Sequence, residues 1–123
     1  MPKYPAIKFR EPEPLQDYYR DREGFLYSVA KLVDDTRNLK PFKCPLASLD
    51  LSAHIWDDQN MIDLAFHCKR VNEADLSKPI IIAWDGVIAD GRHRIIKALS
   101  NGDKHIMAVR MTWKPAPCSK ADK

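Results

Sequence analysis

The chain predicts an α+β fold built as one compact domain, and three observations lead to it. Two short runs of β-forming residues, 80–84 and 87–89, flank the dipeptide Asp85-Gly86, which is typical of a tight hairpin turn. Apolar residues then recur at helical spacing over 92–101, directly after this hairpin. The whole chain has 123 residues, which is close to the usual domain size and long enough to bury a core without disulfides or metal.

Residues 1–40 are expected to form an N-terminal arm followed by a helical extension. Prolines at positions 2, 5, 12 and 14 favour an extended arm. From 15 to 38 the apolar residues follow helical spacing, and Gly24 is expected to break this helix into two pieces. The tyrosines of this stretch are expected in the core rather than as a stacking platform. The extension would then either cover the sheet or form a partner surface.

The predicted domain covers residues 41–113. A strand is expected over 42–51, a helix over 60–71, a helix over 92–101 that ends at Gly102, and a closing strand over 105–111. Residues 114–123 show no apolar pattern and are expected to form a disordered tail. The inward face of the 60–71 helix is expected to contain Met61, Leu64, Ala65, Cys68 and Val71.

The composition is that of an ordinary soluble domain, and it does not by itself indicate a function. The net charge is +3, and 45% of the residues are hydrophobic and 30% charged, as in an ordinary soluble domain. This mild excess of positive charge permits a polyanionic partner but does not require one. The sequence shows no signal peptide and no membrane span, so we expect a cytoplasmic protein without a membrane partner.

The cysteines and histidines do not follow a metal-ligand spacing, so no metal site is expected. Cys44 and Cys68 are interpreted as small buried hydrophobic residues, and Cys118 as an exposed thiol.

The segment Asp90-Gly91-Arg92-His93-Arg94 has the most specific chemistry in the sequence. A strand that ends at a glycine and opens a helix presents backbone N–H groups and the positive end of the helix dipole. Cations in the first helical turn oppose that dipole unless an anion is bound there. The motif therefore predicts a phosphate site. The alternative is that Asp90 only caps the helix and that the arginines are solvent-exposed.

The motif and the order of elements over 43–111 resemble the ParB/sulfiredoxin-like superfamily. ParB proteins carry Gly-Glu-Arg-Arg-x-Arg against the phosphates of CTP, sulfiredoxins carry Gly-Cys-His-Arg with ATP, and related small-molecule kinases carry Asp-Gly-His-His-Arg. Gly91, His93 and Arg94 match these patterns. Arg92 replaces the nucleophilic cysteine of sulfiredoxins, so their repair chemistry is not expected, and Ile96 replaces the last arginine of the ParB motif.

The resemblance implies a small mixed sheet packed by helices and a nucleoside triphosphate, ATP or CTP with Mg²⁺, as the cofactor. It implies that Gly91, Arg92, His93 and Arg94 bind the phosphates. Asp90 or His93 would assist catalysis, and Asp58 or its neighbour Asp57 would act as the base toward a substrate hydroxyl. The alternative is that these two acidic residues only cap the following helix, as acidic residues at this position do in most proteins.

Three functions remain open at this point. The first is a nucleotide- or phosphate-binding protein that acts as an NTPase or as a kinase of a small molecule. The second is a DNA-associated ParB-like module or nuclease, for which we expect only weak duplex binding. The third is a non-catalytic interaction regulator of plasmid or phage type. A homodimer is compatible with each of them.

Overall fold

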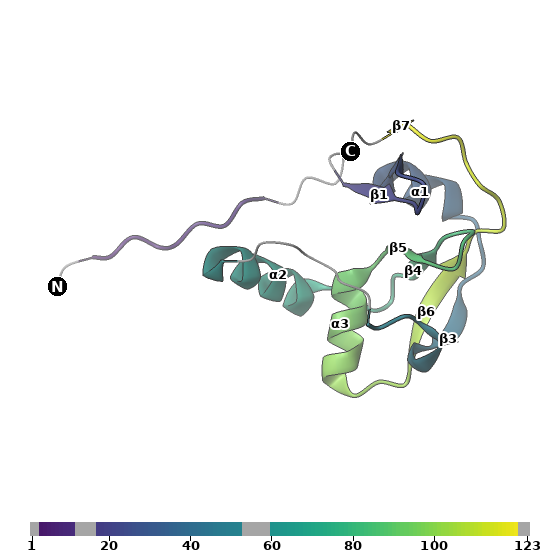
Figure 1. The fold of residues 1–123 in the computed structure, drawn as a ribbon. Coiled ribbons are helices and arrows are strands. Elements are labelled where there is room, and N and C mark those ends of the chain that lie inside the picture. The colour runs from purple at the N-terminus through teal and green to yellow at the C-terminus, as the bar shows by residue number, and fades with distance from the viewer. Residues whose placement is uncertain (1–2, 12–16, 53–59, 121–123) are drawn as a thin grey trace.

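The computed structural model describes residues 3–11, 17–52 and 60–120, and it confirms an α+β fold in which a small mixed sheet is packed by helices (Figure 1). In chain order the elements are β1 (Tyr18–Arg20), β2 (Phe25–Ser28), α1 (Val29–Thr36), β3 (Phe42–Pro45), the 3-10 helix η2 (Leu46–Ser48), α2 (Met61–Glu73), β4 (Ile80–Ile82), β5 (Ile88–Asp90), α3 (Arg92–Asn101), β6 (His105–Arg110) and β7 (Ser119–Lys120). Within these residues no helix is long and apolar enough to cross a membrane.

The main sheet has four strands in the order β3-β6-β4-β5. β3 and β6 pair antiparallel, with Cys44 opposite Ile106, whereas β6 and β4 pair parallel, with Val109 opposite Ile81. All residues of β4 are buried, as expected for a central strand that is covered on both faces. β4 and β5 form the predicted hairpin.

The turn of this hairpin differs from the expected type. The Gly86 N–H donates to the Ala83 carbonyl at 2.9 Å, so Trp84 and Asp85 occupy the centre of the turn. Gly86 follows with a φ of +84°, a left-handed conformation that suits glycine. This is a three-residue hairpin loop that ends in a left-handed glycine, rather than a two-residue turn centred on Asp85-Gly86.

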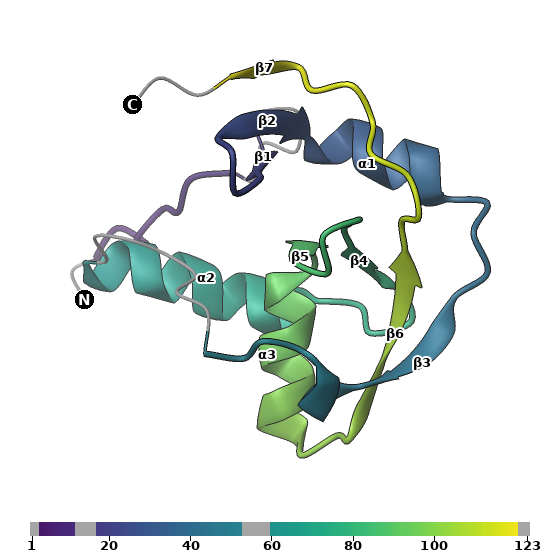
Figure 2. The same ribbon diagram turned by 45° about the vertical axis from the view of Figure 1, so that its right-hand side comes forward.

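The main sheet lies between α3 on one side and α1 with the N-terminal hairpin on the other (Figure 2), and its two faces bury two separate cores. Because side chains alternate along a strand, Ile80 and Ile82 point to one face and Ile81 to the other. The first face packs against α3 through Ile95 and Ala98. The second face is covered by the N-terminal hairpin and α1, which contribute Tyr19, Tyr27 and Leu32. The N-terminal extension therefore covers the sheet and shares its core. The chain is not divided at residue 40 into two separately packed parts.

The prediction of a helix over residues 15–28 is wrong for the described part, because Tyr18–Arg20 and Phe25–Ser28 form an antiparallel hairpin. The Asp21 carboxylate accepts the N–H groups of Glu23 and Phe25 at 3.0 and 2.9 Å and thereby stabilises a turn. Gly24 completes that turn with a φ of +89°. The predicted helix does exist from Val29 onward, where the Ser28 side chain caps it.

Two further expectations are corrected. The expected disordered tail is wrong for Ser119 and Lys120, which pair with Leu26 and Phe25 of β2 and form a second sheet in the order β1-β2-β7. The expected strand over 42–51 ends at Pro45 and continues as η2.

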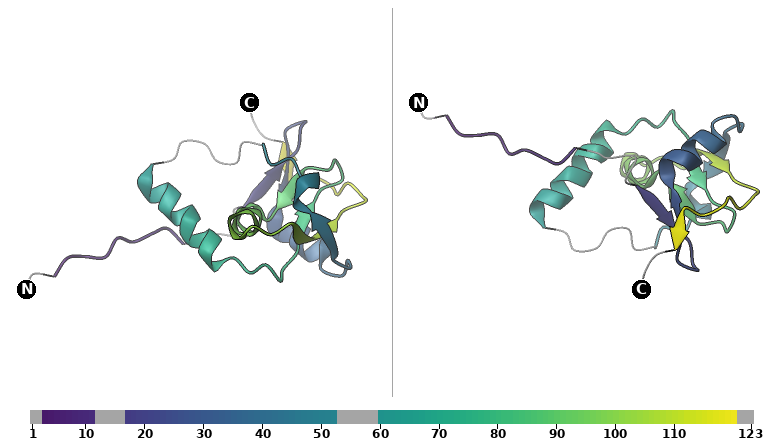
Figure 3. Two further views of the ribbon diagram at one scale, coloured as in Figure 1. Left: turned by 90° about the horizontal axis from the view of Figure 1, so that it is seen from below. Right: turned by 90° about the horizontal axis from the view of Figure 1, so that it is seen from above.

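The inward face of α2 is also not the predicted one. Phe66 and His67 are its buried residues, whereas Met61, Leu64 and Cys68 are exposed. α2 projects from the sheet and packs mainly against α3 (Figure 3). Only a narrow side of the helix is therefore covered.

Buried tyrosine hydroxyls tie the N-terminal hairpin together and to the main sheet. Tyr27 Oη donates to Asp21 Oδ2 at 2.9 Å, and Tyr19 Oη donates to Asp85 Oδ2 at 3.0 Å. The Tyr27 ring meets Trp84 edge-on, with 4.8 Å between the ring centres. Burial and the hydrogen bond to Asp21 raise the pKa of Tyr27 to about 12. The turn of the β4–β5 hairpin is thus held by an aromatic cluster from the N-terminal extension.

Replacement of Tyr27 by Phe should destabilise the fold because a buried carboxylate loses one of its donors. We expect a loss of about 1–2 kcal/mol in the free energy of unfolding, measured by urea denaturation. The matched control is Tyr18→Phe, because Tyr18 is 49% exposed on the neighbouring strand. Equal stability of the two variants would contradict this role of the Tyr27 hydroxyl.

Candidate anion-binding site at the start of α3

Gly91 connects β5 to α3 in a conformation that only glycine adopts easily. Its φ is +111°, and a Cβ atom placed there would collide with the Ile80 side chain and lie 2.8 Å from the Ile80 Cβ. The Gly91 carbonyl accepts the N–H of Ile95 at 2.9 Å, so the helix begins at once. Because Gly91 has no side chain, the N-cap residue offers no acceptor to the first N–H groups of the helix. The positive end of α3 is therefore directed at whatever lies in front of it.

Arg94 fixes the backbone on either side of this glycine. Its Nη2 donates to Asp90 Oδ2 at 2.8 Å, while its Nη1 donates to the carbonyls of Pro79 at 2.6 Å and Lys78 at 3.2 Å. The side chains of Arg94 and Asp90 are only 17% and 27% exposed, respectively. Arg94 therefore joins the end of β5 to the segment that enters β4, and much of its hydrogen-bonding capacity is already used.

His93 pairs with a histidine from another helix. Its Nε2 lies 2.9 Å from Nδ1 of His67 on α2, and the two rings stack with 5.2 Å between their centres. His67 was not among the residues predicted for the site. Its position between Asp63 and Arg70 on one face of α2 is visible in the sequence, but its partner depends on how α2 and α3 cross.

Guanidinium groups from three parts of the chain surround the pair. Arg70 belongs to α2 and Arg92 to α3, and Arg10 belongs to the N-terminal arm. Arg10 and Arg70 both lie over the Phe66 ring, with their Cζ atoms 4.4 and 5.9 Å from its centre. The arm, α2 and α3 thus bring their positive charges to one place.

The surroundings disfavour charge on both imidazoles. Burial lowers the pKa of His93 to about 4, with further contributions from Arg70, His67, Arg94 and Arg92. Burial also lowers the pKa of His67, together with Arg10 and Arg70, while Asp63 opposes this change. Near neutral pH both rings are therefore uncharged, and the positive charge of the site resides on the guanidinium groups and the helix dipole.

The structure brings together the predicted residues Asp90, Gly91, Arg92, His93 and Arg94. Asp58, the predicted base, lies in segment 53–59, outside the described residues. Across the ranges that the structure describes, no group of three or more His, Cys, Asp and Glu side chains is arranged to hold a metal ion. One oxygen of the Asp90 carboxylate, Oδ2, is already paired with Arg94.

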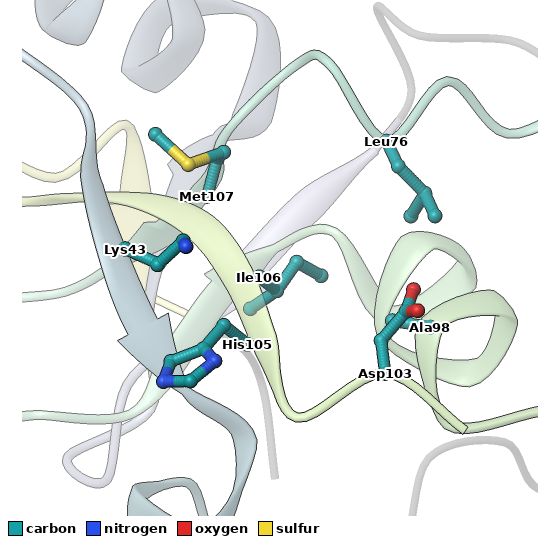
Figure 4. Close-up of a pocket in the computed structure, with 7 residues that line it drawn as sticks. All are labelled: Lys43, Leu76, Ala98, Asp103, His105, Ile106 and Met107. Atoms are coloured by element: carbon teal, nitrogen blue, oxygen red, sulfur yellow. The ribbon is translucent and has the colours of Figure 1, made fainter. Parts of the chain in front are cut away.

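A separate hollow of about 190 Å³ lies near the other end of α3 (Figure 4). Apolar side chains such as Leu76 and Ile106 line it together with the polar groups of Lys43, Asp103 and His105. Ala98 is its contribution from α3, six residues beyond Arg92, which corresponds to roughly 9 Å along the helix axis. The hollow is therefore not part of the site at the motif.

Comparison with protein-family models, with curated proteins and with solved structures found no match. Membership of the ParB/sulfiredoxin-like superfamily therefore stays a prediction from the motif and the order of elements.

Replacement of Gly91 by Ala should strongly destabilise the fold, because the new side chain meets Ile80 and also needs a positive φ. We expect a loss of at least about 2 kcal/mol in the free energy of unfolding. Gly24→Ala is the matched control, since Gly24 has a φ of +89° but a Cβ atom placed there would meet only open space. Equal losses in urea denaturation would mean that the collision with Ile80 contributes nothing.

The stability of the protein without ligand should fall as the pH is lowered from 6.5, the ordinary pKa of histidine, towards about 4, the folded-state pKa of His93. In this window the unfolded chain binds more protons than the folded chain, so acid favours unfolding. His93→Gln should flatten this part of the profile, whereas the exposed His105 should be replaceable by Gln without effect. An unchanged profile in His93→Gln, measured by urea denaturation at several pH values, would contradict the assignment.

Proposed function

We propose that the chain binds the phosphate groups of a nucleoside triphosphate, ATP or CTP, or of another phosphorylated small molecule, at the start of α3. The observation that carries this proposal is the concentration of guanidinium groups around the helix start opened by Gly91. Like charges held close together repel each other, and two of these cations also oppose the helix dipole. An anion in front of Arg92 and His93 would relieve both effects.

The side chains divide into those that face a ligand and those that shape the site. We assign phosphate binding to Arg92, His93 and the first N–H groups of α3, with Arg70 contributing charge. Arg94 keeps the phosphate-binding loop in shape through Asp90 and the carbonyls of residues 78 and 79. Arginine suits this task because its planar guanidinium can form several directed hydrogen bonds at once.

Magnesium would arrive with the nucleotide, because Mg²⁺ is commonly held by substrate phosphates, waters and only one or two carboxylates. Turnover as an NTPase or a small-molecule kinase would require a base near the terminal phosphate, and Asp58 and Asp90 remain our candidates for that chemistry. Binding is the primary proposal, and turnover is its extension.

The contacts of the lysines favour a small ligand over duplex DNA. A duplex site needs several dispersed cations that are available to backbone phosphates. Lys97 Nζ instead donates to the carbonyls of Asn72 and Ala74 at 2.9 and 2.8 Å, at the end of α2. Lys69 Nζ forms an ion pair with Glu73 on the same helix, at 3.9 Å from its Oε1. Weak duplex binding with only a shallow dependence on salt is therefore the expected result.

The test is a thermal-shift and calorimetric screen of the full chain against ATP, CTP, GTP, pyrophosphate and inorganic phosphate, each with and without Mg²⁺. A ligand at about one hundred times its dissociation constant adds about 2.7 kcal/mol to the stability of the native state. Stabilisation by one or more of these compounds is the expected result. No binding by any of them, together with tight duplex binding that weakens steeply with salt, would replace this proposal with the nucleic-acid function.

Arg92→Ala and Arg94→Ala should affect different properties. Loss of a charge-assisted hydrogen bond at Arg92 should weaken binding of the best ligand by about ten- to a hundredfold in calorimetry. Without ligand the same variant should be slightly more stable in urea denaturation, by about 0.3–1 kcal/mol, because a cation that opposes the helix dipole is removed. Arg94→Ala should lower the free energy of unfolding by about 2 kcal/mol, because an ion pair and bonds to strand carbonyls are lost.

Arg37→Ala is the control for both variants, since the Arg37 side chain is 71% exposed just after α1. Normal ligand binding by Arg92→Ala would remove Arg92 from the site. Wild-type stability of Arg94→Ala would contradict its structural role.

A further inference from the structure

The hydrogen bond between His67 and His93 restricts how many protons the pair can carry. One of the two facing nitrogens, His67 Nδ1 and His93 Nε2, must donate while the other accepts. One additional proton can be placed on an outer nitrogen of the donor ring, and the shared bond then becomes charge-assisted. A second additional proton would put hydrogens on both facing nitrogens and break the bond. The bond between the two rings is therefore compatible with one added proton but not with two.

Within the part of the chain that the structure describes, the charges that act on the pair come from the N-terminal arm, α2 and α3. The N-terminal arm contributes Arg10, and α2 contributes Arg70 and the opposing carboxylate of Asp63. α3 contributes Arg92 and Arg94, the second of which is paired with Asp90. Among these described groups the cations outweigh the carboxylates, and together with burial they disfavour the added proton.

A bound anion would reverse this balance because its negative charge lies beside the same imidazoles. Protonation and anion binding would then favour each other, since each ligand increases the affinity for the other by the same factor.

We propose that the His67–His93 pair takes up one proton when a phosphate-type anion binds at the start of α3, so that binding tightens as the pH falls. This inference rests on the proposed function. It gives His67, a residue on α2, a part in binding through its bond to His93. In the bound state the pair would act as a cationic hydrogen-bond donor, and in the free state as a neutral one.

Sulfate is the best probe, because it stays a dianion throughout the relevant range and any pH dependence must come from the protein. Calorimetry is performed on the full chain at constant ionic strength from about pH 7.5 to about pH 5.5, the range in which histidines commonly titrate. Buffers of different ionisation enthalpy report the protons taken up. We expect uptake to approach one proton and the dissociation constant to fall by up to about tenfold per pH unit.

The matched variant is the double substitution His67→Asn with His93→Gln. The Asn amide lies close to the position of Nδ1 and the Gln amide close to that of Nε2, so the hydrogen bond can be kept without a titratable ring. We expect this variant to bind sulfate more weakly than the wild type, without proton uptake and with little dependence on pH, because the charge-assisted donor is lost while the arginines remain. His105→Gln is the control, because it removes an exposed histidine on β6 and should behave as the wild type.

The outcomes separate this inference from the proposed function. Sulfate binding that is independent of pH and takes up no proton would overturn the inference and leave the anion site in place. Absence of sulfate binding at every pH would overturn the inference, and absence of binding by phosphate, pyrophosphate and the nucleotides as well would overturn both.

Proton uptake that persists in the double variant would assign it to other groups and overturn the inference. If that variant does not fold, the wild-type protein provides the decisive measurement by NMR. The titration midpoint of His93 should rise when sulfate is added, and an unchanged midpoint would overturn the inference.

Discussion

Ile80 packs directly against the backbone of Gly91, at a place where any Cβ atom would collide with it. Ile80 is fully buried in the core beneath α3, so it cannot move aside without opening the sheet. Gly91 also has the left-handed conformation in which the chain leaves β5 and enters α3, so both the space and the backbone favour glycine here. The direction of α3, and with it the packing of Ile95 and Ala98, follows from this turn. The candidate site and the core are therefore fixed by one steric constraint, and a mutation that relieves it must disturb both.

The start of α3 also shows why this arrangement is unfavourable without a ligand. Basic side chains at a helix N-terminus lower stability, and burial of an imidazole among guanidinium groups adds a further cost. Asp90 offsets part of this charge, but it does so by pairing with Arg94 behind the loop. The motif itself supplies no second carboxylate to balance Arg92 and the nearby Arg70. An anion that stabilises this end of the helix would therefore stabilise the whole fold.

Local signals in the sequence predicted the elements next to the motif well. The helix over 92–101 has the expected bounds, and Gly102 ends it in a left-handed conformation. The N-terminal hairpin could not be predicted in the same way. Tyr19 and Tyr27 are eight residues apart, a spacing compatible with one face of a helix, yet they face each other across two paired strands. The pairing of His67 with His93 could not be predicted from the sequence either, because it depends on how α2 and α3 cross and not on any local spacing.

The position of α2 connects these points to function. α2 packs mainly on α3, and polar contacts hold it there at two positions along its length. Lys97 binds the carbonyls at its C-terminal end, and His93 binds His67 near its middle. The second contact involves the same imidazole that faces the proposed anion. Under the proposed function, a change of charge on this pair would therefore act both on the bound anion and on one of the two polar contacts that hold α2 against α3.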